Sequence, residues 1–151
     1  MTTKSSEYLS LEVRRLMKAP RDRVFAAWTD PAQVRKWFGP ENVTTDEFVA
    51  DLRIGGRYRW DLTNPEGEKM TCEGEYLELV PDRKIVLSWQ WQDDEDWENQ
   101  ISVVTVELQD AAGGTEVRLK HEKLPTEASR DGHNRGWKSV LDKLEEFCRA
   151  N

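Results

Sequence analysis

The chain has 151 residues, a length typical of one domain with a core large enough to fold without disulfides or metal ions. Its 22 Lys and Arg against 29 Asp and Glu give a net charge of −7, which argues against nucleic acid or anionic lipid as the main partner. No window reaches the ~18 apolar residues of a membrane span and we find no secretory signal, so we expect a cytoplasmic protein.

The first forty residues predict one strand followed by two short helices. We expect residues 1–7 to form a disordered tail, because they are polar and lack a period. The apolar residues Leu9, Leu11, Val13 and Met17 all fall at odd positions, which indicates a half-buried strand. Pro20 suits the first position of a helix, and Pro31 can begin a second one that Gly39 would end.

Residues 43–122 predict six more strands joined by short turns. In chain order they are Val43–Leu52, Gly56–Thr63, Lys69–Leu79, Lys84–Gln92, Asn99–Gln109 and Thr115–Glu122. The breaks between them are short enough for antiparallel hairpins, so the order of strands is a meander.

The last segment predicts a long amphipathic helix. Its apolar positions are Trp137, Val140, Leu141, Leu144, Phe147 and Cys148. Thr126 and Asp131 are both suitable N-caps, so the start of the helix stays open. Together these elements predict one α+β domain over residues 1–151, in which a seven-stranded antiparallel sheet packs around a terminal helix. Such a sheet can leave an internal cavity between itself and the helix.

Four blocks of sequence resemble the SRPBCC (START/Bet v 1-like) superfamily. They are LMKAPRDRVFAAWTDPAQVRKWFGP (16–40), DLRIGGRYRW (51–60), GEYLELVPDRKIVLSWQW (74–91) and GWKSVLDKLEEF (136–147). They look most like the branch related to the C-terminal domain of the Hsp90 ATPase activator and to CalC-like proteins. The resemblance implies a helix-grip fold with a deep cavity, in a superfamily that binds lipids, sterols, polyketides or aromatic metabolites. The frequent Trp-Trp of the family is Trp37-Phe38 here, and no catalytic set is transferable.

Strand alternation places many aromatic side chains on the inner face of the sheet. Tyr58 and Trp60 share one face of their strand, and so do Trp89 and Trp91. The predicted ligand-binding residues are Phe38, Tyr58, Trp60, Tyr76, Trp89, Trp91, His121, Trp137 and Leu141. For any single ring, plain core packing is the alternative.

The two histidines receive different interpretations. His121 alternates with Val117 and Leu119, so it lies on the apolar face and is the sole catalytic candidate. A core histidine with satisfied hydrogen bonds is the alternative, and we place ligand recognition before catalysis. His133 is interpreted as a solvated or capping residue. No metal-ligand spacing joins the two, and we expect neither a metal nor a cofactor.

Three further features receive structural interpretations. The acidic run Asp93–Glu98 predicts a solvated hairpin tip, in which Trp97 either covers one end of the cavity or folds back on the sheet. The basic residues near the first helix predict a solvated face. Cys72 and Cys148 are far apart in sequence, and we expect both to be reduced and buried.

The sequence favours a protein that encloses a small apolar or aromatic molecule. A cyclase, dehydratase or hydrolase on the same scaffold is the first alternative, and it would require His121 as acid or base. An Hsp90-associated module is the second. We do not expect a full activator, because the resemblance reaches only one domain of such proteins and 151 residues leave no room for another. An uncovered sheet edge would make a homodimer easy to form.

Overall fold

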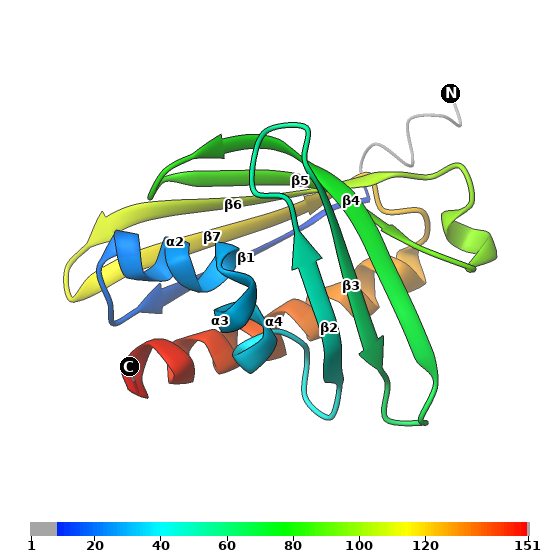
Figure 1. The fold of residues 1–151 in the computed structure, drawn as a ribbon, viewed down its shortest axis with the longest axis horizontal. Coiled ribbons are helices and arrows are strands. Elements are labelled where there is room, and N and C mark those ends of the chain that lie inside the picture. The colour runs from blue at the N-terminus through cyan, green and yellow to red at the C-terminus, as the bar shows by residue number, and fades with distance from the viewer. Residues whose placement is uncertain (1–8, 151) are drawn as a thin grey trace.

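The computed structural model describes residues 9–150, which form a curved sheet packed around a long helix (Figure 1). In chain order the elements are β1 (Leu11–Met17), α2 (Arg21–Thr29), α3 (Pro31–Trp37), β2 (Thr44–Ala50), β3 (Arg57–Thr63), β4 (Lys69–Val80), β5 (Lys84–Trp91), the short 3-10 helix η1 (Glu95–Trp97), β6 (Ser102–Ala111), β7 (Gly114–Glu122) and α4 (Glu127–Ala150). The predicted α+β helix-grip architecture is confirmed. The tail predicted for residues 1–7 lies outside the described residues.

The sheet is antiparallel throughout, with the strand order β1-β7-β6-β5-β4-β3-β2. The pairing of β4 with β5 contains a register shift between Tyr76 and Glu78, an irregularity of the kind that bends a strand locally. At the same place, a Cβ added to Gly74 would lie 2.0 Å from the carbonyl oxygen of Ser88. Only glycine permits this close approach of two strands.

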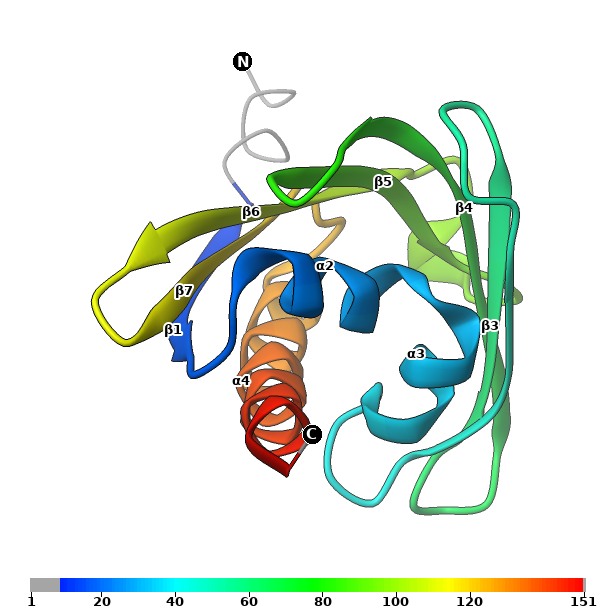
Figure 2. The same ribbon diagram turned by 60° about the vertical axis from the view of Figure 1, so that its left-hand side comes forward.

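The three helices lie inside the curl of the sheet. Figure 2 shows α4 nearly end on, with the sheet passing from β1 and β7 around to β3 and with α2 and α3 beside α4. The helix α4 packs against β1, whereas α3 packs against β2. The side chains between these layers form the core, and a space remains near the first half of α4.

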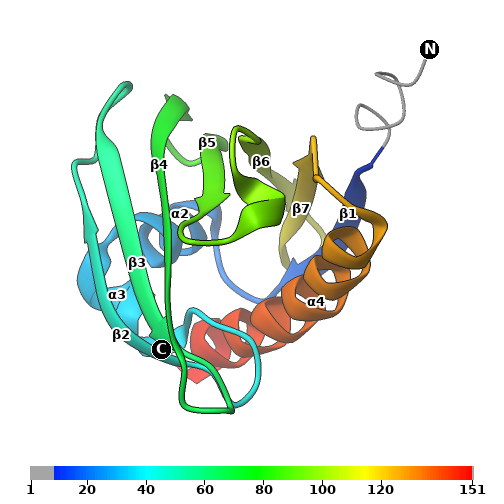
Figure 3. The same cartoon turned by 90° about the vertical axis from the view of Figure 1, so that its right-hand side faces the viewer.

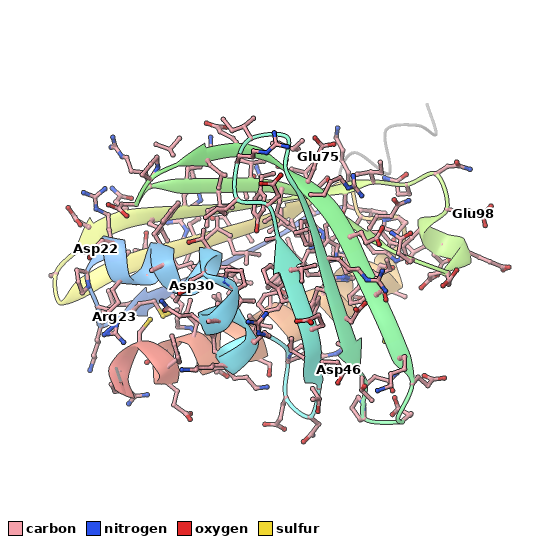
Figure 4. The ribbon with its side chains drawn as sticks, viewed as in Figure 1. Asp22, Arg23, Asp30, Asp46, Glu75 and Glu98 are labelled. Carbon is pink, nitrogen blue, oxygen red and sulfur yellow. The ribbon has the colours of Figure 1, made fainter. Side chains whose placement is uncertain are left out.

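One helix start differs from the sequence prediction, and the start that was left open is resolved. Pro20 is the N-cap of α2 rather than its first helical residue. The helix α4 begins at Glu127, because the Thr126 hydroxyl accepts a hydrogen bond of 3.0 Å from the Ser129 amide, and the Asp131 alternative is therefore wrong. At the junction of α2 and α3, Asp30 caps α3 through the Ala32 amide (Figure 4).

Burial of the cysteines matches the prediction. Cys72 and Cys148 are buried and free of disulfides. Burial raises the pKa of both thiols, so they pack as small apolar side chains. Among residues 9–150, no helix is long and apolar enough to cross a membrane.

Candidate functional site

A cavity of about 330 Å³ opens between the sheet and the first half of α4. Its wall comes from β3, β4, β5, η1, α4 and the loop after α3, and Figure 3 looks onto this end of the molecule. Most lining side chains are apolar or aromatic, and the polar ones include Asn64, Asp94 and Ser129. None of the described lining residues is Lys or Arg. The volume lies within the ~300–1,000 Å³ of typical small-molecule sites.

The structure brings most of the predicted ligand-binding residues to this region. The cavity wall contains Phe38, Trp60, Trp89, Trp91 and Trp137. Tyr58 and Tyr76 lie deeper, where they line a separate inner void of about 30 Å³. Leu141 and His121 are fully buried and line neither space in the described part of the chain. A ligand-binding role for each of these residues stays a prediction.

The aromatic rings of the cavity form one continuous cluster. The Phe38 and Trp60 ring centroids are 4.5 Å apart, and those of Trp89 and Trp137 are 5.1 Å apart. Tilted and edge-to-face pairs of this kind are the arrangement that aromatic rings prefer. Helix α4 and strands β3 and β5 thus meet through rings, and a planar ligand could continue the same packing.

His121 belongs to a hydrogen-bonded chain that joins four elements. The Trp137 Nε1–H donates to His121 Nδ1 over 3.0 Å, so the imidazole proton lies on Nε2 and is donated to Ser102 Oγ over 2.8 Å. The Ser102 hydroxyl donates in turn to the Trp89 carbonyl over 2.7 Å. Burial lowers the pKa of His121 well below its ordinary value, and the nearby His133 lowers it further.

The pair of Ser102 and His121 has the spacing of a nucleophile and its base, but its environment is that of a core. Both side chains are fully buried and neither lines the cavity. The serine hydroxyl already donates to a backbone carbonyl, and both imidazole nitrogens have partners. This series of hydrogen bonds therefore positions Trp137 and Trp89 rather than offering a reactive group.

His133 is the lining residue that sequence reasoning placed wrongly. It lies inside α4, half-buried, and faces the cavity rather than the solvent. Its Nε2 accepts from the Trp91 Nε1–H over 3.0 Å, and its Nδ1–H donates to the Ser129 carbonyl over 2.7 Å. Burial lowers its pKa. The signal was available, because His133 is four residues before Trp137 and thus one turn along the same face.

Trp97 closes one end of the cavity. Its side chain is only 2% exposed, and its ring centroid lies 5.5 Å from that of His133. The Gln90 side chain donates to the Trp97 carbonyl over 2.8 Å, which holds η1 against β5. The acidic side chains of the same loop are exposed, as predicted, and Figure 4 shows Glu98 on its outer side. Trp97 thus forms one end of the cavity wall, and exposed acidic side chains surround it in the sequence.

Two glycines of α4, Gly132 and Gly136, line the cavity. Glycine inside a helix is less stable than alanine by about 1 kcal/mol. A Cβ added to Gly136 would meet no atom within 4 Å, so no close contact requires glycine there. The absence of a side chain instead leaves space open in the cavity.

Comparisons with known proteins agree with this architecture. The model of one family, described as Activator of Hsp90 ATPase homolog 1-like protein, matches residues 18–149. A protein of Chromobacterium violaceum is 26% identical with a TM-score of 0.83, covering 92% of this chain and 96% of its own. CalU16 of Micromonospora echinospora is 28% identical with a TM-score of 0.70, covering 92% and 75%.

A third solved structure supports the fold alone. The AHSA1 protein of Silicibacter pomeroyi is 24% identical with a TM-score of 0.80, covering 93% of this chain and 98% of its own. No curated protein matches the chain significantly.

Proposed function

The chain belongs to the Activator of Hsp90 ATPase homolog 1-like family within the SRPBCC superfamily, and from this premise we propose that it binds a small neutral aromatic or apolar molecule in the cavity beside α4. The observation that carries the proposal is the cavity itself, about 330 Å³ in volume and walled by aromatic rings. Such a space stays accessible because two helix positions facing it have no side chain.

The titratable side chains of the cavity favour binding over catalysis. Among the described lining residues these are His133 and Asp94. Both imidazole nitrogens of His133 are engaged, and Asp94 accepts from the Asp96 amide over 3.0 Å at the start of η1. An enzyme that used His133 or Asp94 as an acid or base would have to break the hydrogen bonds that engage that side chain. The family description refers to Hsp90, but the cavity suits a small molecule, so we place Hsp90 association after small-molecule binding. We expect the protein to act in the cytoplasm.

The proposal is tested with 2-isopropenylnaphthalene, a neutral two-ring probe. We expect saturable one-to-one binding in a titration of ¹⁵N-labelled protein, with shifts of the indole N–H signals of Trp89, Trp91 and Trp137. The same titration of Lys138→Leu is the control, because Lys138 is exposed on α4 and should not affect the probe. No saturable shift in the wild type would contradict the proposal.

The charge of the cavity predicts discrimination against anions. At pH 7.5 we expect 2-naphthoate to bind at least about tenfold more weakly than 2-acetylnaphthalene, which has nearly the same shape. The carboxylate would lose its hydration with no Lys or Arg in the wall, and Asp94 lies in that wall. Calorimetric titration of both probes measures the ratio. Equal affinities would show that the cavity does not select by charge.

A further inference from the structure

Two indole N–H groups in the aromatic cluster have no hydrogen-bond acceptor. Trp28 Nε1 and Trp89 Nε1 are buried and unpartnered, in side chains that are 9% and 4% exposed. Buried polar groups of proteins almost always have a partner, because an N–H removed from water without an acceptor destabilises the fold. Two such groups in one cluster indicate a missing acceptor.

Neighbouring indoles show that this is a local feature of two rings. Trp37 donates to the Ala27 carbonyl over 2.9 Å, and Trp60 donates to Thr45 Oγ1 over 3.0 Å. Trp91 and Trp137 donate to the two histidines. These four rings are therefore satisfied within the protein, in contrast to Trp28 and Trp89.

The inner void is the space that both unpartnered indoles line. Its volume of about 30 Å³ has room for roughly two or three water-sized groups, at ~10–15 Å³ each. Four rings line both the void and the larger cavity, namely Phe38, Trp60, Trp89 and Trp137. The void and the cavity thus share a wall of rings, and the void has room for an oxygen atom but not for an aromatic ring.

We infer that the ligand carries a neutral oxygen acceptor, such as a ketone carbonyl, at one end of an apolar or aromatic body. The body occupies the outer cavity, and the oxygen enters the inner void and accepts from Trp28 and Trp89. This inference rests on the proposed function and adds the chemical class of the ligand. It gives both unpartnered N–H groups an acceptor at once.

The test compares two probes of matched shape. In 2-acetylnaphthalene an oxygen atom replaces the terminal methylene of 2-isopropenylnaphthalene, so their affinities differ mainly through the oxygen. We expect the ketone to bind about tenfold more tightly in calorimetric titrations. We also expect it to move the indole proton signals of Trp28 and Trp89 downfield relative to the alkene complex, because hydrogen bonding deshields the proton.

Substitution of the donor is the second part of the test. Trp28→Phe should reduce the preference for the ketone to about threefold, because Trp89 keeps its N–H, and should leave the affinity for the alkene within about twofold of the wild type. Trp37→Phe is the matched control, because its ring lies 4.9 Å from that of Trp28 but its N–H already has an acceptor. If Trp28→Phe does not fold, the isosteric β-(3-benzothienyl)alanine at position 28 removes the N–H and keeps the ring size.

The outcomes separate this inference from the proposed function. A preference for the ketone that falls when the Trp28 N–H is removed supports the inference. Equal binding of both probes overturns it, and would mean that resident water satisfies the two indoles, while the proposed function stands. A ketone preference that is unchanged by loss of the Trp28 N–H also overturns it. Binding of neither probe overturns the proposed function, and this inference with it.

Discussion

We expect Gly136→Leu to abolish detectable binding of 2-isopropenylnaphthalene and to raise the free energy of unfolding by roughly 1 to 2 kcal/mol. Gly136 lines the cavity, and a Cβ there meets no atom within 4 Å, so the leucine side chain has space that only a ligand would otherwise fill. Leucine also has a higher helix propensity than glycine and would bury apolar surface. Calorimetric titration and urea unfolding measure the two effects.

The opposite signs of the two effects make the experiment decisive. Most substitutions that abolish binding also destabilise the protein, whereas this one separates the cavity from the fold. Lys138→Leu is the control, because it adds the same side chain to an exposed position of the same helix and should leave binding unchanged. Undiminished binding by Gly136→Leu would place the ligand outside this cavity, and a lower stability would mean that the space is not free.

Strand alternation predicted much of the fold, because each strand has one face toward the core. In β7 the pattern placed Val117, Leu119 and His121 inward, and all three are fully buried. In β3 it placed Tyr58 and Trp60 inward, and both line the cavity or the void behind it. A period of two is reliable when a sheet has one buried face.

The site was less predictable, because it depends on helix phase and on empty space. With Asp131 as the N-cap, His133 would lie in the first turn of α4, where a capping role is common, whereas the Thr126 cap places it well inside the helix and on the face of Trp137. The open space beside Gly136 leaves no periodic signal, because a missing side chain is neither apolar nor polar in a pattern. The partners of His121 are Ser102 and Trp137, whose meeting requires the register of β6 on β7 and the packing of α4 on the sheet.

We expect the two histidines to make the free energy of unfolding decrease steeply as pH falls below 6.5. Burial lowers the pKa of His121 and His133 from their ordinary value of 6.5, so the folded protein keeps both neutral where the unfolded chain takes up protons. In that window the unfolded state binds more protons, and the free energy of unfolding decreases as pH falls. The slope is about 1.4 kcal/mol per pH unit for one histidine and about 2.7 for two, until pH reaches the lowered values.

Urea unfolding between pH 7.5 and 5 measures this slope. We expect His121→Gln and His133→Gln each to be less stable than the wild type at pH 7.5, because each leaves an indole N–H with a poorer acceptor. Each should also lose about 1.4 kcal/mol per pH unit of slope, and the double variant should be nearly flat. Carboxyl groups affect the pH dependence of stability only at lower pH. The ordinary pKa of Glu12, for example, is 4.5, and hydrogen bonds from Arg14 and Arg118 lower it further. A double variant as steep as the wild type would therefore show that the acid sensitivity does not come from the imidazoles that hold Trp91 and Trp137 in the cavity wall.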